Sequence, residues 1–264
     1  MNSLPHMHAF LAAVQFLTRV PVPGGMNRPD ADRSLLRAAV VFFPLVGGMI
    51  GATTGGLIWI AAHVWPPTVA VVLGLAFEAI LTGAFHEDAV ADCCDGFGGG
   101  WTRADVLRIM TDSRVGAFGS LGLALAVLLR IAGLTAIDLP TMVAVSAAAG
   151  ALGRWAGVFV MSVVPPLPDH TGLSKDVGAR VGPRHVAAAA SLTMLAAAWY
   201  AAIDPVRFAA AVGCVVMASL VWAYYVRRRL GGITGDCAGF ACYLGQLLVL
   251  LVAAAHPLSA WVGS

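Results

Sequence analysis

Long apolar stretches, each about the length of a membrane-spanning helix, recur through most of this chain. The stretch 115–136 contains one charged residue, Arg130, and the stretch 237–256 contains no Asp, Glu, Lys or Arg. An α-helix needs roughly 20 mostly apolar residues to cross the hydrocarbon core of a bilayer. Because the apolar residues do not alternate with polar ones as they do in barrel strands, the pattern predicts an all-α fold, a polytopic transmembrane helical bundle.

The composition excludes a water-soluble globule. Only 11% of the 264 residues are charged and 59% are hydrophobic, whereas soluble domains carry about 25% charged residues. The net charge of +2 gives no reason to expect a nucleic acid as a partner. We therefore expect a single integral membrane domain over residues 1–264, in contact with the lipid bilayer.

Apolar runs bounded by Pro, Gly and charged residues predict about seven spans. The segment 4–19 is short for a span and is expected to lie at the membrane interface as an N-terminal helix. Pro44 and the glycines from Gly47 to Gly51 should let the first span kink or pack closely. The spans are expected near 36–62, 66–85, 115–136, 140–163, 186–203, 206–226 and 237–256.

The charged residues gather on one side of the predicted bundle. All but three of the 16 Lys and Arg residues, and all but three of the 14 acids, fall in or at the edge of four segments on that side. Basic residues are enriched on the cytoplasmic side of membrane proteins, so we expect the functional face to be cytoplasmic. The segments are 1–35, 86–114 (the expected acidic, glycine-rich active-site loop), 164–185 and 227–236.

The stretch 85–100, FHEDAVADCCDGFGGG, concentrates carboxylates at the end of an apolar span. If that span continues as a helix, Asp88, Asp92 and Asp95 stand at i, i+4 and i+7 and share one face. Such carboxylates repel one another, and a hard divalent cation, Mg²⁺ or Mn²⁺, would offset the repulsion. The alternative is a solvated acidic helix end, or one paired with Arg103, Arg108 and Arg114.

The glycine run 96–100 should end this helix and free backbone N–H groups to approach a ligand. Gly96, Gly98 and Gly99 are therefore candidate substrate contacts, with Glu87 beside the aspartates. A plain turn is the alternative reading.

Further polar groups follow in residues 101–119. Arg108 and Asp112, at i, i+4 spacing, predict a helix salt bridge, which competes with a role for Arg108 at the site. Asp112, Ser113 and Arg114 precede two glycines and are assigned to the site. Carboxylates for Mg²⁺, exposed amides and guanidinium groups are what phosphoryl transfer requires.

A second glycine and aspartate element occupies 227–236, before the last span. Its arginine triplet is read as a membrane anchor. Thr234, Gly235 and Asp236 stand at a predicted helix start, where Asp236 either caps the helix or reaches the same metal and phosphate site.

Each of the remaining polar residues is open to two interpretations. His86 either positions a carboxylate or transfers a proton, or is a polar helix-end residue, and Glu78 is its candidate partner. Lys175 lies in the loop 165–180, which covers a substrate or simply connects two spans. Arg154 lies inside an apolar span and should face the bundle interior or a polar cavity.

Four motifs make the chain resemble the cobalamin synthases, the adenosylcobinamide-GDP ribazoletransferases, over nearly its whole length. The first acids of that family read H-x-D-G-x-A-D-x-x-D-G followed by a Gly pair. Here Ala89 replaces a glycine, and Tyr243 and Gln246 stand near positions where the family often has acids. The motifs are QFLTRVPVP at 15–23, TGAFHEDAVADCCDGFGGG at 82–100, RIMTDSRVGAFG at 108–119 and GGITGD at 231–236.

The resemblance implies the last assembly step of cobalamin synthesis, at the cell inner membrane. α-Ribazole, or its 5′-phosphate, would be joined to adenosylcobinamide-GDP with release of GMP, and Mg²⁺ would be the cofactor. A second copy of the chain and other cobalamin-pathway enzymes are considered as further partners, by analogy alone.

The resemblance implies a role for each candidate site residue. Catalysis is assigned to His86, Asp92 and Arg114, with the choice of base between Asp92 and His86 left open. Metal binding is assigned to Asp88, Asp92, Asp95, Asp112 and Asp236. Substrate binding is assigned to Glu87, Gly96, Gly98, Gly99, Ser113, Arg108, Thr234, Gly235 and Lys175.

Two other functions compete with this reading. A membrane phosphotransferase using a CDP-linked donor also spaces acids and glycines along helix ends, but its Asp-Gly-x-x-Ala-Arg order is missing here. An ion-coupled transporter would carry its charges near the bilayer midplane, whereas here only Glu78 and Arg154 lie well inside predicted spans.

Overall fold

The computed structural model describes residues 4–22, 33–167 and 181–256, and in these ranges the chain forms helices joined by short connections. An isolated parallel bridge joins Pro166 to Ile233. The all-α prediction is confirmed. The helices are α1 (Leu4–Leu17), α2 (Arg33–Val40), α3 (Phe43–Ala61), α4 (Pro67–Thr82), α5 (Phe85–Gly99), α6 (Arg103–Met110), α7 (Ala117–Thr135), α8 (Met142–Val163, after a 3-10 turn at Leu139–Thr141), α10 (Pro183–Ile203), α11 (Pro205–Leu230) and α12 (Gly235–Ala254).

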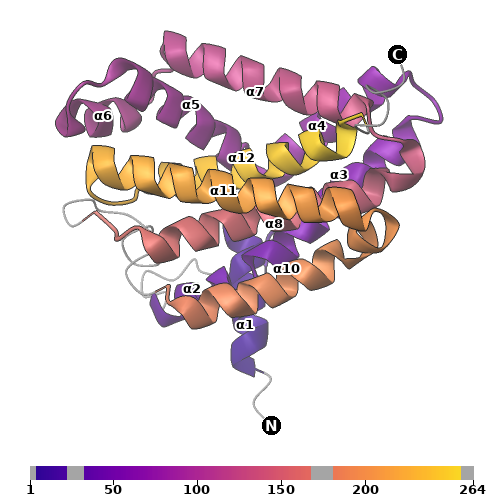
Figure 1. Cartoon of the computed structure of the whole chain (residues 1–264), viewed down its shortest axis with the longest axis horizontal. Helices are drawn as coiled ribbons and strands as arrows, with labels where there is room; N and C mark the ends of the chain where they lie inside the picture. The colour runs from indigo at the N-terminus through magenta and orange to yellow at the C-terminus, as the bar shows by residue number, and fades with distance from the viewer. Residues whose placement is uncertain (1–3, 23–32, 168–180, 257–264) are drawn as a thin grey trace.

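Six helices are long and apolar enough to cross a membrane, and a seventh span results if α4 and α5 are counted as one broken span. This agrees with the prediction of about seven spans. The long helices lie side by side, and α1 points across them (Figure 1). α1 has 14 residues, fewer than a span requires, as expected for the segment 4–19.

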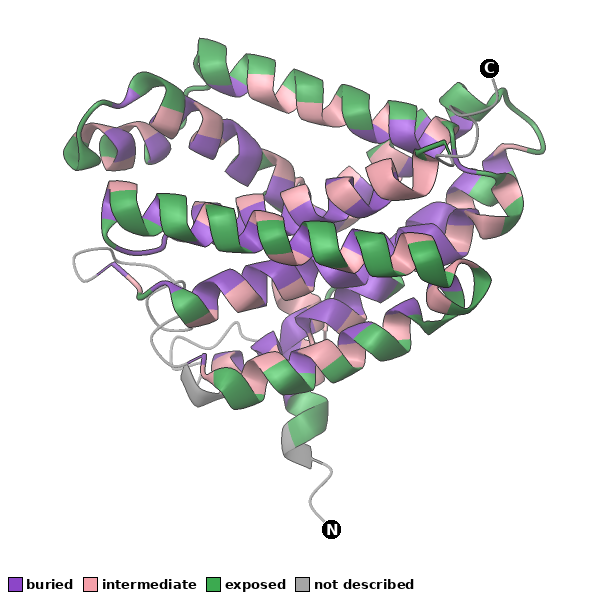
Figure 2. Cartoon of the chain, viewed as in Figure 1, coloured by how far each residue is buried: buried purple, intermediate pink, exposed green. Residues whose placement is uncertain are grey.

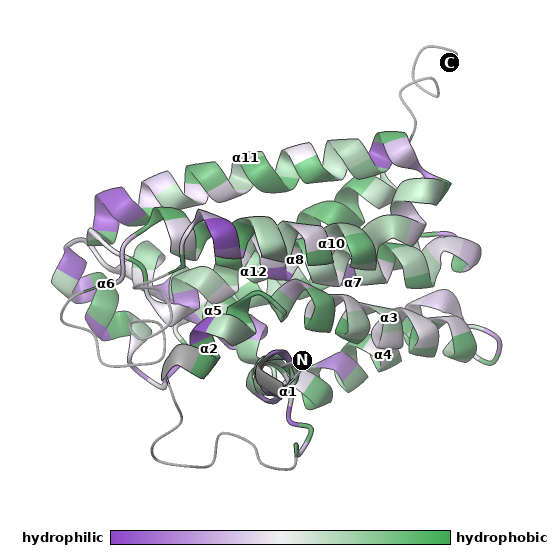
Figure 3. Ribbon diagram, turned by 90° about the horizontal axis from the view of Figure 1, so that it is seen from below, coloured by the Kyte–Doolittle hydropathy of each residue, from purple (hydrophilic) through white to green (hydrophobic). Residues whose placement is uncertain are grey.

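Much of the outer helices α7, α10 and α11 is exposed (Figure 2), and most of their length is hydrophobic (Figure 3), as a membrane protein requires. Exposed residues of α7, α10 and α11 include Leu121, Leu128, Leu195, Val206 and Val221. Large exposed apolar side chains in such numbers are rare on soluble monomers. The outward faces therefore support a multi-pass membrane protein.

α8 is the central helix and is buried along most of its length. Its contact with α3 is backbone to backbone, because a Cβ at Gly51 would overlap the Ser146 carbonyl and a Cβ at Gly47 would overlap that of Gly150. On another side, Gly153 lies against the Cys242 carbonyl of α12. The prediction of close packing at Gly47 and Gly51 is confirmed.

The first predicted span, 36–62, is two helices. α2 ends at Val40, a turn occupies residues 41–42, and α3 starts at Phe43 with Pro44 in its first turn. Proline suits a first turn because it lacks the N–H that would remain unpaired there.

The expectation that the second span, 66–85, continues as one helix through the acids is also wrong. α4 ends at Thr82, and α5 starts at Phe85 at an angle of 90° to it. Gly83 and Ala84 make the corner in the left-handed region, with φ values of 72° and 56°. The acids therefore lie on a separate helix, and the segment 86–114, expected as a loop, consists largely of α5 and α6.

Candidate active site

The acid-bearing helix α5 is held between α7 and α12. It runs antiparallel to α7, with Gly98 against Phe118 and Cys94 against Gly122. On its other side, Ala89 meets Gly239 of α12. These contacts fix the direction in which the α5 carboxylates point.

The structure brings together carboxylates from two helices. Asp88 is exposed and Asp92 half-buried on α5, and Asp236 lies in the first turn of α12. The negative charges of Asp88, Asp236 and Asp95 all act on Asp92. The position of Asp236 beside α5 could not be derived from spacing, because more than 140 residues separate it from Asp92.

Asp95 is buried and anchors the start of α7. Its Oδ2 accepts the Gly116 amide at 2.6 Å and its Oδ1 accepts the Gly119 amide at 2.8 Å. The first amides of a helix have no partner within the helix, and they carry the positive end of its dipole. A carboxylate in this place is a structural cap as well as a predicted metal ligand.

Asp112 and Arg114 pair with each other in the connection before α7. The Arg114 side chain donates to both Asp112 oxygens, at 3.0 and 2.7 Å, and its amide donates at 3.0 Å. These hydrogen bonds lower the pKa of Asp112 to about 2. The predicted Arg108–Asp112 bridge is wrong, because Arg108 pairs with Asp105 at 3.9 Å. Ser113 lies exposed between the paired residues.

The glycine run lies mostly inside α5, which ends at Gly99 with Gly100 as its C-cap. Gly96 makes room for Met110 of α6, and Gly98 makes room for Phe118 of α7. At the helix end, Arg229 of the arginine triplet donates to the Gly100 carbonyl at 2.8 Å. Packing therefore accounts for Gly96 and Gly98, while the substrate contacts assigned to the glycines stay predictions.

Thr234, not Asp236, caps α12. Its hydroxyl accepts the Cys237 amide at 3.2 Å, and Thr234 is 1% exposed. Gly235 is the first helical residue. Lys175 lies outside the described residues.

Beneath the acids, a buried polar network joins five helices. Arg130 of α7 bonds both oxygens of Glu78 on α4 at 2.9 Å and Glu87 on α5 at 3.2 Å. Glu78 is thus the partner of Arg130, and its proposed pairing with His86 is wrong. Gln246 of α12 donates to Glu78 at 3.2 Å and accepts from Arg154 of α8 at 2.6 Å.

Arg154 and His86, two residues that the sequence singled out, lie in this network or beside it. Arg154 is 1% exposed and faces the bundle interior, as predicted. His86 is 4% exposed, and the charges of Arg130 and Arg154 act on it. His86 is therefore buried, unlike Asp88, Asp92 and Asp236, which we call the acid cluster.

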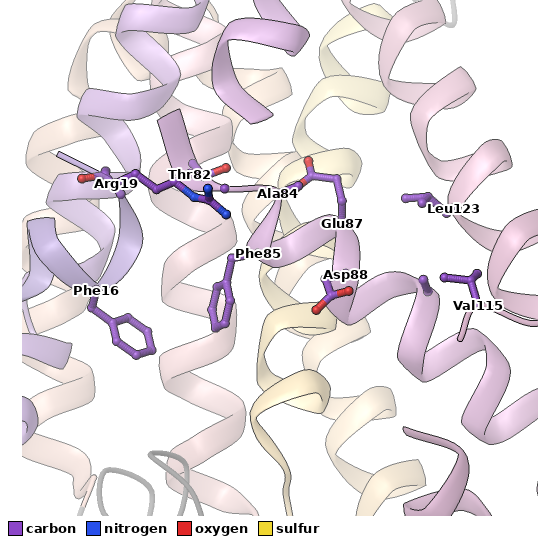
Figure 4. Close-up of a pocket in the computed structure, with 12 residues that line it drawn as sticks. Phe16, Arg19, Thr82, Ala84, Phe85, Glu87, Asp88, Val115 and Leu123 are labelled. Atoms are coloured by element: carbon purple, nitrogen blue, oxygen red, sulfur yellow. The ribbon is translucent and has the colours of Figure 1, made fainter. Parts of the chain in front are cut away.

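A pocket of about 550 Å³ opens beside Asp88. Figure 4 shows Arg19 on one side of it and Glu87 and Asp88 on the other, with Phe16 and Phe85 below. The sequence placed Arg19 among the basic residues of the predicted cytoplasmic segment 1–35 and in the QFLTRVPVP motif, but not at the site, because nothing in local spacing connects it to α5. Lining residues also include Thr18, Thr82, Gly83, Ala84, Ala91, Val115 and Leu123.

The donor chemistry of the cluster suits a hard cation, although the side chains are not gathered into a finished site. Within the described ranges, no three His, Cys, Asp or Glu side chains converge as metal ligands do. Carboxylate oxygens without thiolate or imidazole partners favour Mg²⁺ or Mn²⁺ over Zn²⁺.

Comparison with known proteins gives the family. The profile of the family described as cobalamin-5-phosphate synthase matches residues 9–254. Proteins named adenosylcobinamide-GDP ribazoletransferase are similar: that of Ralstonia nicotianae is 39% identical over 258 residues, covering 96% of this chain and 95% of the relative. That of Bradyrhizobium diazoefficiens is 39% identical over 250 residues, covering 93% of each chain. No solved structure matches. The chain belongs to the cobalamin-5-phosphate synthase family.

Proposed function

We propose that this protein joins α-ribazole, or its 5′-phosphate, to adenosylcobinamide-GDP and releases GMP, using Mg²⁺ held by the acid cluster. Family membership makes the chain a transferase of cobalamin biosynthesis, and the names of the relatives supply the reaction. The observation that supports a metal-assisted mechanism is that Asp88 of α5 and Asp236 of α12 both lie close enough to Asp92 for their charges to act on it, and that Asp88 also lines a pocket.

We assign Mg²⁺ to Asp88 and Asp236, whose charges both act on Asp92. A bound Mg²⁺ would neutralise charge on the diphosphate and on the departing GMP. Asp95 and Asp112 are weaker candidates, because the first holds two α7 amides and the second is paired with Arg114.

Residues of this chain can take up the proton that the attacking ribose hydroxyl loses. In the proposed reaction, the ribose hydroxyl oxygen of α-ribazole bonds to the phosphorus attached to cobinamide, and the bond from that phosphorus to the GMP oxygen breaks. Asp92 takes the hydroxyl proton, because it is only half-buried and lies near the carboxylates of Asp88 and Asp236, whereas His86 is buried. Arg114 is exposed and can exchange Asp112 for a phosphoryl group, since exposed ion pairs are weak.

We also propose that the site faces the cytoplasm from the inner membrane. The acid cluster lies at the end of the bundle where α7 and α12 begin and α11 ends in three arginines. Basic residues at helix ends mark the cytoplasmic side.

Release of GMP tests the proposal. The purified protein in detergent should release GMP only when adenosylcobinamide-GDP, α-ribazole and Mg²⁺ are all present, and a chelator should stop the release. Asp92→Asn should abolish turnover, whereas Asp138→Asn, an exposed residue before α8, should leave it unchanged. Normal turnover by a correctly inserted Asp92→Asn variant would contradict the assigned role.

A further inference from the structure

Arg19 is fixed by its backbone at the corner between α4 and α5. Its amide donates to the Leu81 carbonyl in the last turn of α4, at 2.7 Å. The preceding residue, Thr18, is held in turn by its hydroxyl, which donates to the Val14 carbonyl at 2.7 Å. The end of α1 is therefore tied to the helix that precedes the acids, and Arg19 has a defined position.

Gly83 leaves room for the Arg19 side chain. A Cβ at Gly83 would overlap the Arg19 Nε, so the guanidinium lies directly over the corner. Gly83 has a φ of 72°, which also favours glycine. Gly83 thus both forms the turn and leaves the space in which the Arg19 guanidinium lines the pocket.

The surroundings of the Arg19 guanidinium differ from those of the other arginine side chains near the site. Arg130 and Arg114 each have a carboxylate partner, and Arg154 has the Gln246 amide oxygen. Among the described residues, no ion pair engages the Arg19 guanidinium, which lines the pocket across from Asp88 (Figure 4).

We propose that this pocket binds the diphosphate of adenosylcobinamide-GDP, with Arg19 pairing with its phosphoryl oxygens. The inference rests on the proposed function, because that function supplies the diphosphate and the cation that would join it to Asp88. A guanidinium matches phosphate oxygens in a forked geometry, whereas an acidic wall alone would repel an anion. The volume of about 550 Å³ lies within the range of roughly 300–1,000 Å³ for small-ligand sites.

The apolar side of the pocket suits a flat ring beside the phosphates. Phe16 and Phe85 pack edge to face, with ring centroids 5.6 Å apart, and Phe85 is 41% exposed. Exposed aromatic faces stack on bases and other planar groups. This places the guanosine end of the donor, the part released as GMP, next to Arg19.

A binding measurement and a kinetic one test the inference together. GMP binding in the presence of Mg²⁺ is measured by calorimetry, and KM is measured for both substrates, in a sugar-headgroup detergent free of phospholipid. Arg19→Gln should raise the GMP Kd and the KM for adenosylcobinamide-GDP by about 10- to 100-fold, the loss expected for a charge-assisted hydrogen bond. The KM for α-ribazole should not change. Arg19→Lys should fall between, and Arg184→Gln, exposed at the start of α10, should match the wild type.

Three results would overturn the inference. One is unchanged GMP binding and KM in Arg19→Gln or, if that variant misfolds, wild-type values in Arg19→Lys. The second is a fall in kcat alone. The third is an effect that appears only in nanodiscs containing anionic phospholipid, which would assign Arg19 to a lipid phosphate. If the wild type releases no GMP from its two substrates yet binds GMP through Arg19, the proposed reaction fails and the phosphate site stands.

Discussion

At the scale of single residues, the corner at Gly83 and Ala84 decides where the acids point. Both residues have positive φ values, and Gly83 also lies beneath the Arg19 guanidinium. Local sequence gave no warning of this corner, because glycines are common in the apolar spans of this chain and most of them sit inside helices. A single Gly-Ala pair between an apolar segment and the acidic segment 85–100 is equally compatible with a continuous helix.

Gly83→Ala should destabilise the protein, because an L side chain in the left-handed region costs about 1–2 kcal/mol and the new Cβ also meets Arg19. The thermal midpoint in detergent measures this loss. Gly213→Ala is the matched control, since its Cβ would point into open space within α11 and should stabilise that helix by up to about 1 kcal/mol. Equal midpoints for Gly83→Ala and the wild type would refute the argument.

The Asp95→Asn variant distinguishes the role of Asp95 as a cap of α7 from its predicted role as a metal ligand. The amide side chain has one acceptor oxygen in place of two, so one of the Gly116 and Gly119 amides loses its partner, at a cost of about 1–3 kcal/mol. We expect a lower thermal midpoint with little change in the Mg²⁺ concentration for half-maximal activity. A large rise in that concentration, with unchanged stability, would identify Asp95 as a ligand.

At the scale of helices, the sequence predicted the long apolar elements well and the short polar ones poorly. The predicted spans 115–136 and 140–163 agree closely with α7 and α8, because hydropathy alone marks them. A kink near Pro44 was expected, and the break falls just before it, at 41–42, whereas the corner at 83–84 was missed. The Glu78–Arg130 pair could not be predicted, because 52 residues separate its members.

The buried network should stabilise the arrangement of α4, α5 and α7. Arg130→Met leaves Glu78 buried without its main partner, and such losses cost about 3–5 kcal/mol. Adding Glu78→Gln to that variant should recover part of the loss, because it removes the unpaired charge. Thermal midpoints of the single and double variants check this, with exposed Arg184→Met as the control, and a wild-type midpoint for Arg130→Met would contradict it.

At the scale of the whole molecule, the bundle has one polar end, where α5, α6 and the arginines of α11 meet. Ser113 precedes α7 and Asp138 follows it, so the two residues should lie on opposite sides of the membrane. In a background without the five native cysteines, a membrane-impermeant maleimide should label Asp138→Cys in intact cells and Ser113→Cys only in inverted vesicles. Labelling of both from one side would contradict the proposed topology.

We propose that Asp88 and Asp236, on different helices, hold one metal site. Electron paramagnetic resonance of Mn²⁺ bound to the purified protein with GMP tests it most directly. We predict Mn²⁺ binding that Mg²⁺ displaces and that Asp88→Asn and Asp236→Asn each weaken by at least about tenfold, with Asp138→Asn unchanged. Equal Mn²⁺ affinity in all four proteins, each folded, would contradict the account.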